Sequence, residues 1–186
     1  MEKLIFYWPH NSLLKRDGDE FTRCALEYKD YSSRRYIIPK KSKLKRRQYM
    51  LELLGKLKNT NEKFDRFAFF CHGWPKSFDA GYSVENIGML GRRLAAIANH
   101  GARVYLFCCK TGKLEDGLAA KLSLTSGLPV FAHSTSGHTT RNPFKHVFTD
   151  GWRTALFPPV KDKELWAHHK KEVAEDPFGF LERVEL

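Results

Sequence analysis

The sequence predicts an α/β fold built on a mostly parallel sheet that is flanked by helices, and two observations carry this prediction. Two nearly continuous apolar runs, at residues 64–71 and 104–109, are bounded by glycines and separated by a segment with helical spacing. Such runs are typical of neighbouring parallel strands that are buried on both faces. Further apolar runs at residues 3–8 and 129–132 predict two more strands in a layered α/β order with right-handed crossovers.

The length and composition are those of one folded domain. The chain has 186 residues, of which 42% are hydrophobic, so we expect a single domain over residues 1–186 with a sizeable core. The main core is expected at residues 3–137, and a C-terminal hairpin and helix at residues 144–175. No apolar run approaches the roughly 20 residues of a membrane-spanning helix. The N-terminal run is too short for a signal peptide, so we expect a cytoplasmic protein.

The four cysteines indicate the redox state of the protein, and the positive charge indicates the kinds of partner that it can bind. Without a secretory signal, we expect reduced thiols rather than a disulfide framework. The formal charge of +11 suits nucleic acid, an acidic membrane surface or an acidic protein, and does not choose among them.

The run KKSKLKRR at residues 40–47 carries most of the local charge. It can contact nucleic acid or an acidic partner, or it can be the solvated face of an amphipathic helix that packs on the sheet. An apolar stripe at helical spacing favours the second interpretation. The stripe consists of Leu44, Leu51, Leu54 and Leu57.

The other segments are assigned from turns and helical spacing. Ser42 is placed to cap the basic helix. Residues 73–81, which read GWPKSFDAG, are too rich in glycine and proline for regular structure and predict a loop. We expect helices at residues 83–100 and 112–126, whereas residues 17–33 fit either a helix or an edge strand.

The last quarter of the chain follows a different pattern. A DG pair lies between two alternating runs at residues 146–149 and 152–157, which predicts an antiparallel hairpin with a type I′ turn. Residues 161–175 predict a terminal helix, with Asp162 as its cap. A short strand is also expected earlier in the chain, at residues 35–38.

Reactive side chains gather at the carboxyl ends of the predicted strands, where ligands bind in parallel sheets. His72 follows one strand, and Cys108 and Cys109 end the next. Because side chains alternate along a strand, the two cysteines should point to opposite faces. A cysteine nucleophile needs a thiolate, a proton-transfer partner and donors for the oxyanion. His72, one cysteine and the Gly73 amide could supply these, and a helix starting at Gly112 would favour the thiolate.

At these residues the sequence resembles the caspase-like cysteine peptidases, especially the bacterial CHAT-type group. His72-Gly73 matches the His-Gly element, and the CKTG motif that begins at Cys109 matches the nucleophile element. The resemblance covers residues 3–137 and implies a three-layer caspase-like fold. It implies a cysteine endopeptidase with Cys109 as nucleophile, His72 as proton-transfer residue, and the amides of Gly73 and Cys109 as oxyanion hole. Phe107 stands where caspases carry Gln, so strict preference for Asp is not implied.

The resemblance further implies a protein or peptide substrate, a thioester acyl-enzyme, and neither a cofactor nor a metal. Candidate pocket residues are His10, Asp79, His133, Ser134 and Arg141. Arg141 could receive an acidic substrate side chain, and Asp79 a basic one if its loop folds inward.

Two other interpretations fit the sequence poorly, and a third stays open as the alternative. A metal site from His72 and the nearby cysteines is awkward, because adjacent strand residues diverge. An α/β-hydrolase would need a Gly-x-Ser-x-Gly elbow, which the sequence lacks. A catalytically inactive basic α/β module could bind nucleic acid or a protein partner through residues 40–47.

Overall fold

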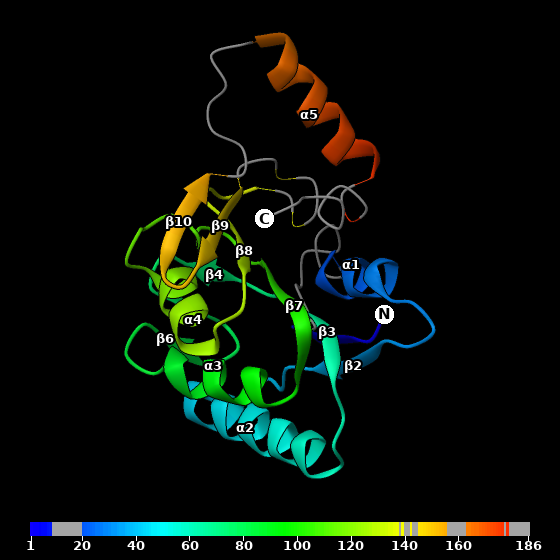
Figure 1. The fold of residues 1–186 in the computed structure, drawn as a ribbon, viewed down its shortest axis with the longest axis vertical. Helices are drawn as coiled ribbons and strands as arrows, with labels where there is room; N and C mark the ends of the chain where they lie inside the picture. Colours follow the sequence, from blue (N-terminus) through cyan, green and yellow to red (C-terminus); the bar gives the residue numbers. More distant parts are fainter. Residues whose placement is uncertain are drawn as a thin grey trace.

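The sheet is the centre of the computed structural model, which describes residues 1–8, 20–137, 139, 142, 145–155, 163–176 and 178. Its seven strands lie in the order β10-β9-β8-β7-β3-β1-β2 (Figure 1). Five of them run parallel: β1 (Lys3–Tyr7), β2 (Arg34–Ile37), β3 (Phe64–Phe70), β7 (Ala98–Phe107) and β8 (Val130–His133). The four strands predicted from apolar runs are therefore confirmed as parallel neighbours.

The predicted hairpin completes the sheet. β9 (Lys145–Thr149) pairs antiparallel with both β8 and β10 (Trp152–Ala155). Asp150 and Gly151 have φ values of 50° and 83°, the conformation that a type I′ turn requires. The last two residues predicted for this hairpin, 156 and 157, lie outside the described residues.

Helices cover both faces of the sheet (Figure 1). α2 (Lys43–Asn59), α3 (Ile87–Ala96) and α4 (Leu118–Ser126) pack on one face, and α1 (Glu20–Tyr28) packs on the other. Right-handed crossovers explain this division. The connection from β1 to β2 moves toward one edge of the sheet, whereas the connections from β2 to β3 and onward move toward the other edge, so their helices cover opposite faces. The alternative of an edge strand within residues 17–33 is wrong.

The terminal helix is also present, as α5 (Lys163–Glu175). Val173 is buried, and Phe178 packs on the rings of Tyr28 and Phe107, with centroids 4.8 and 5.7 Å apart. The predicted cap, Asp162, lies outside the described residues. Among the helices of the described chain, none is long and apolar enough to cross a membrane.

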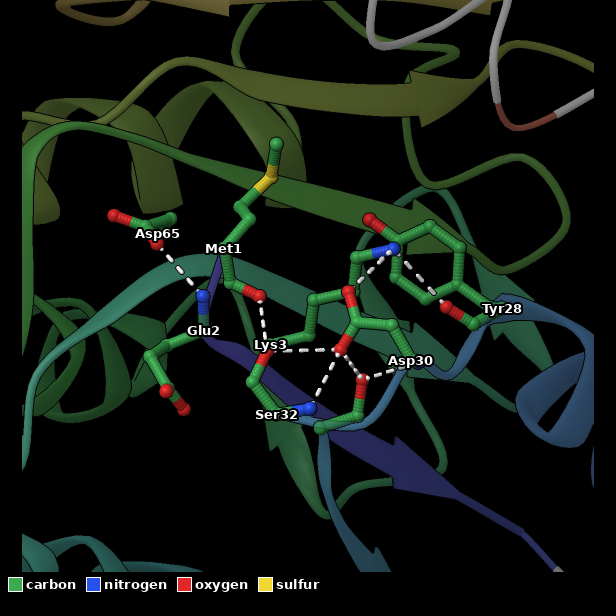
Figure 2. A network of polar contacts seen from close by, with 8 residues as sticks. Met1, Glu2, Lys3, Tyr28, Asp30, Ser32 and Asp65 are labelled. Carbon is green, nitrogen blue, oxygen red and sulfur yellow. Dashed lines mark hydrogen bonds and ion pairs between the residues drawn. The ribbon is translucent and has the colours of Figure 1, made fainter.

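Polar contacts fix the start of β1 against α1 and β3 (Figure 2). The Lys3 ammonium lies 3.4 Å from the Asp30 carboxylate and donates to the Tyr28 carbonyl at 3.2 Å. The Glu2 amide donates to the Asp65 carboxylate at 2.7 Å. These contacts therefore tie the first strand to the end of α1 and to the neighbouring strand β3.

The segment at residues 73–81 is not the irregular loop that its composition predicted. It holds β4 (Gly73–Trp74) and β5 (Ser77–Phe78), which form a small antiparallel sheet with β6 (Tyr82–Ser83). A two-residue turn at Pro75-Lys76 allows this pairing, and the buried rings of Phe78 and Tyr82 anchor it to the core. Gly81 has a φ of 94°, which suits glycine at the turn into β6.

The helix predicted at residues 83–100 is shorter than expected. The Asn86 carboxamide accepts a hydrogen bond from the Ser83 amide at 3.1 Å, and this turn delays the helix until Ile87. α3 ends at Ala96, and Gly101 lies within β7 rather than after a helix. Its φ is 74°, where the pairing of β7 with β3 shifts register.

The helix predicted from Gly112 begins only at Leu118. Successive turns occupy the intervening residues, with hydrogen bonds from Lys113 to Lys110 at 3.1 Å and from Gly117 to Leu114 at 3.2 Å. Gly127, with a φ of 66°, ends α4 as predicted. The helix start that was expected at Gly112 is therefore wrong, and the first amides of α4, those of Leu118 and Ala119, donate to the carbonyls of Pro75 and Thr111 at 3.1 and 3.3 Å.

The basic helix α2 begins as predicted, because the Ser42 hydroxyl accepts from the Lys45 amide at 3.5 Å. Its buried face consists of Met50, Leu54 and Leu57. Leu44 is 54% exposed, since at 100° per residue it lies roughly 120° from Met50 around the axis. The predicted stripe was therefore correct only in its second half.

Candidate active site

A cleft of about 260 Å³ opens at the carboxyl edge of β3, β7 and β8, beside the first turn of α1. It lies next to the reversal of strand order between β1 and β3, the region where open α/β sheets bind ligands. Its lining residues are Glu20, Phe21, His72, Phe107, Cys109, His133, Gly137 and Thr139. The two side chains predicted as a catalytic pair therefore share one cleft.

His72 is held from two sides. It follows Cys71 just beyond β3, and its carbonyl accepts a hydrogen bond from the Asp79 amide at 3.0 Å. Its ring packs edge to face on Phe21 of α1, with centroids 5.0 Å apart and planes at 86°. The small sheet thus fixes the backbone of His72, and α1 orients its imidazole toward the cleft.

Cys109 lies on a tight turn after β7. Lys110, the next residue, has a φ of 60°, a conformation that costs a non-glycine residue of order 1 kcal/mol or more. The Thr111 hydroxyl donates to the Cys108 carbonyl at 2.9 Å and closes the turn. The amides of Lys110 and Gly112 donate to the carbonyls of Thr135 and His133, at 3.2 and 2.8 Å. The β8 end therefore holds both sides of the turn.

The Cys109 thiol is partly exposed, whereas the other three cysteines of the chain are buried. Its sulfur lies 3.9 Å from the Gly137 carbonyl, to which it can donate a weak hydrogen bond. A thiol on the wall of an open cleft can meet a substrate, so exposure and position both favour Cys109 as the nucleophile.

Gly73 allows the two strand ends to approach each other. A Cβ atom there would lie 2.7 Å from Thr111 Cγ2, and 2.8 Å from both Cys108 Cβ and the Cys109 carbonyl oxygen. Any larger residue would push the His72 segment away from the Cys109 turn. Glycine at this position is therefore a condition for a shared cleft.

The orientation of the Gly73 amide follows from the β4–β5 pairing. Hydrogen-bonded and non-hydrogen-bonded pairs alternate along an antiparallel ladder. The His72 carbonyl bonds the Asp79 amide, so the next pair, Gly73 with Phe78, is non-hydrogen-bonded. This directs the Gly73 N–H away from β5, which suits a donor to a substrate oxyanion.

Cys108 diverges from Cys109, as alternation predicted. Its sulfur lies 3.5 Å from Cys71 Sγ and 3.4 Å from the Phe69 carbonyl oxygen, in the core under α3 and α4. Burial, together with the neighbouring Cys71 thiol, raises the pKa of Cys108 well above its ordinary value. Cys108 is therefore a structural thiol.

The predicted pocket residues are only partly brought together. His133 is buried at the end of β8, lines the cleft and packs edge to face on Phe107, with centroids 6.2 Å apart. Ser134 is half-buried next to it, outside the described lining. Asp79 instead pairs with Arg46 of α2 at 3.2 Å. His10 and Arg141 lie outside the described residues.

Five lining residues were not among the predicted site residues: Glu20, Phe21, Phe107, Gly137 and Thr139. Glu20 and Phe21 belong to α1, which the sequence left open as helix or strand, so their approach to the cleft could not be foreseen. The Glu20 carboxylate accepts from the Thr139 amide at 2.8 Å, which joins α1 to the segment after β8. Gly137 completes this wall. The sequence DGDE at residues 17–20 was the one available signal for an acidic residue here.

No group of three or more metal-ligating side chains occurs among the residues that the structure describes. Cys71 and Cys108 face the core, whereas His72 and Cys109 face the cleft, so the four side chains do not converge.

Comparison with known proteins adds one distant likeness. A solved structure that aligns with the chain is prephenate dehydrogenase from A. aeolicus in complex with hydroxyphenyl propionate and NAD+. The two are 14% identical with a TM-score of 0.41, and the alignment covers 95% of this chain but 57% of that chain. A likeness of this strength carries no argument about fold or activity. No protein-family model and no curated protein matches the chain.

Proposed function

We propose that the protein is a cysteine peptidase with a caspase-like fold, in which Cys109 attacks a peptide bond and His72 transfers the proton. One observation carries the proposal: His72 and Cys109, from the ends of two adjacent parallel strands, line the same cleft. The mostly parallel sheet, flanked by helices and extended by a hairpin, agrees with the fold that the CKTG and His-Gly motifs imply.

Acylation begins when His72 accepts the proton of Cys109 and the sulfur attacks the carbonyl carbon of a peptide bond. A bond forms between sulfur and carbon, and the carbonyl oxygen becomes an oxyanion. The amides of Gly73 and Cys109 donate hydrogen bonds to it. The imidazolium of His72 then gives its proton to the leaving amine, the carbon–nitrogen bond breaks, and a thioester remains.

Deacylation reverses the roles. His72 takes a proton from a water molecule, whose oxygen attacks the thioester carbon. The carbon–sulfur bond breaks, a carboxylic acid leaves, and the proton on His72 restores the thiol of Cys109. No cofactor or metal is needed at any step, and the substrate is a protein or peptide.

The test is cleavage of a mixed peptide library, read by mass spectrometry. Cys109→Ala and His72→Ala should each lower the cleavage rate by at least about a thousandfold, and the double variant should be no worse than either single one. Cys108→Ala is the matched control and should retain cleavage. Equal cleavage by wild type and Cys109→Ala would refute the proposal.

A second candidate is a basic binding module that acts on no peptide. A crevice of about 360 Å³ between α2 and α3 favours it, since three cations rim an apolar floor. The cations are Lys58, Arg92 and Arg93, and the apolar residues are Leu51, Met89 and Ala96. The lysines of the 40–47 segment are also exposed, at the start of α2.

Binding of a short DNA duplex or an acidic peptide at several salt concentrations tests this candidate. Affinity should fall steeply with salt, and Arg92→Ala with Arg93→Ala should weaken it. A duplex bound more tightly than the peptide would favour nucleic acid. If neither probe binds in low salt, the binding-module interpretation is excluded.

A further inference from the structure

Lys145, the first residue of β9, is a buried basic residue beside Phe107 and His133, which also line the cleft. It is 2% exposed and lies directly opposite His133 in the β8–β9 pairing. The rings of Tyr105, Phe107 and Phe131 surround it, in a gap too narrow to admit water. Its amine donates to the Asn142 carbonyl, which is its one hydrogen-bond partner among the described residues.

From Asn142, hydrogen bonds continue to the turn of Cys109. The buried Asn142 carboxamide donates to the carbonyl and the hydroxyl of Thr135, both at 3.3 Å. The Thr135 carbonyl accepts from the amide of Lys110, at 3.2 Å. Lys110 follows Cys109 in the chain and holds the left-handed conformation that shapes the turn. A connected path therefore runs from the buried amine to the residue after the nucleophile.

We propose that Lys145 is a positioning residue whose buried amine holds the segment after β8 against the Cys109 turn. Its importance for catalysis rests on the proposed function, whereas the coupling between the amine and the turn does not. The amine fixes the Asn142 carbonyl, Asn142 fixes Thr135, and Thr135 fixes the Lys110 amide.

The protonation state of Lys145 should alter this hold. Burial lowers the pKa of Lys145 to about 7. Above that pH the neutral amine remains buried and still donates to Asn142. Below it the ammonium gains from reaching water, and the contact should loosen. Among the residues that the structure describes, Tyr105 of β7 and His133 of β8 are the titratable groups that line the gap around Lys145, whereas His146 of β9 is turned to the Gly112 carbonyl at 2.8 Å.

Amide hydrogen exchange, followed by NMR on the whole chain without substrate, tests the proposal. The Lys110 amide reports on the path, and the Gly112 amide, bonded to the His133 carbonyl, is the internal reference. Lys145→Met has no donor and should lower the protection of Lys110 relative to Gly112 by about tenfold, the effect of one lost hydrogen bond. Lys145→Gln keeps a neutral donor, so its protection ratio at pH 8 should stay within about threefold of wild type.

The pH profile separates positioning from general stability. In wild type the protection ratio should fall as the pH drops through about 7, and in Lys145→Gln it should be constant. A pH dependence that persists in Lys145→Gln, which retains His133 and Tyr105, would overturn the role of Lys145. So would equal changes at Lys110 and Gly112, or no change at Lys110 in Lys145→Met.

Thr135→Val is a second variant in case the Lys145 variants do not fold. It removes the hydroxyl that the Asn142 carboxamide contacts and leaves Lys145 in place. Protection of Lys110 relative to Gly112 should fall by about threefold, and an unchanged ratio would contradict the path. Since no substrate is used, failure of the peptidase proposal would leave these outcomes unaffected.

Discussion

At the scale of single residues, Gly73 sets how closely the chain after β3 and the Cys109 turn after β7 can approach each other. It packs against the backbone of the Cys109 turn and against Thr111, at distances that leave no room for a Cβ atom. Its neighbour His72 is held by Phe21 and by the Asp79 amide, so displacement of Gly73 would also move His72. The geometry of the cleft therefore depends on a residue that contributes no side chain.

We expect Gly73→Ala to destabilise the protein by roughly 1–3 kcal/mol, as overpacking does in other cores. It should also separate His72 from Cys109 and abolish any peptide cleavage. Urea denaturation and the peptide library assay measure the two effects.

Gly55→Ala in α2 is the matched control. The added methyl group would meet only Arg93 Nη1, at an ordinary 3.8 Å. Because alanine favours a helix over glycine by up to about 1 kcal/mol, this variant should be as stable as wild type or more so. If Gly73→Ala behaved like Gly55→Ala, the close approach at Gly73 would not govern the cleft.

The presence of His72 and Cys109 in one cleft could be predicted from sequence, because each residue follows an apolar run that forms a strand. The rest of the cleft wall could not. Glu20 and Phe21 are distant in sequence from His72, and nothing in their local pattern states which strand ends α1 will cover. Alternation predicted that Cys108 and Cys109 point to opposite faces, whereas the choice of Cys109 for the cleft rested on its place in the CKTG motif.

At the scale of elements, the small sheet of β4, β5 and β6 holds the backbone of His72 at the cleft. Arg46 of α2 ties it to the helix layer. The guanidinium donates to the Asp79 carbonyl at 2.5 Å, lies 3.2 Å from its carboxylate and 4.6 Å from the centre of the Trp8 ring. Because Asp79 also donates its amide to the His72 carbonyl, Arg46 holds the backbone of His72 indirectly.

Arg46→Met should destabilise the protein by roughly 2–3 kcal/mol, because it leaves the largely buried Asp79 carboxylate without its cation. Arg23→Met is the control, since Arg23 forms an exposed pair with Glu27 within α1. Exposed helical pairs contribute about 0.3–0.5 kcal/mol. Equal losses in the two variants, measured by urea denaturation, would show that Arg46 is not a structural tie.

The buried Lys145 of β9 should also make the free energy of unfolding depend on pH. Its pKa is about 7 in the folded protein and 10.5 by reference in the unfolded chain. Between these values the unfolded chain binds a proton that the folded protein does not, so the free energy of unfolding should rise with pH. The full rise is on the order of 5 kcal/mol.

Lys145→Met should remove this rise and should be more stable than wild type at pH 6, where the buried ammonium is most unfavourable. Denaturation in urea from pH 6 to pH 10 measures both. The same pH slope in wild type and variant would mean that Lys145 reaches water in the folded protein.

Element boundaries were the weakest part of the sequence prediction, for a physical reason. The turns at Ser83 to Asn86 and Lys110 to Gly117 are held by hydrogen bonds that compete with helix formation. The spacing of apolar residues carries no information about these hydrogen bonds. The small sheet escaped prediction because its strands are two residues long. By contrast, the long buried strands were predictable, because their apolar runs can be satisfied only in a sheet covered on both faces.

At the scale of the whole molecule, the order of the strands determines where chemistry can occur. The chain moves from β1 to the edge strand β2, then returns across β1 to β3, so α1 lies on one face and α2, α3 and α4 on the other (Figure 1). The carboxyl ends of β3 and β7 are therefore open to the cleft between α1 and the segment after β8. The sequence predicted a sheet with helices on its faces, but it did not predict which helices cover which face.

The most direct test of the shared site is the rate at which iodoacetamide modifies each cysteine, mapped by mass spectrometry at pH 6. We expect Cys109 to react at least about tenfold faster in wild type than in His72→Ala, because the imidazole supports the thiolate. Cys24, Cys71 and Cys108 are buried and should stay unmodified on that timescale. If His72→Ala left the rate at Cys109 unchanged, or if Cys108 reacted first, His72 and Cys109 would not form one catalytic site.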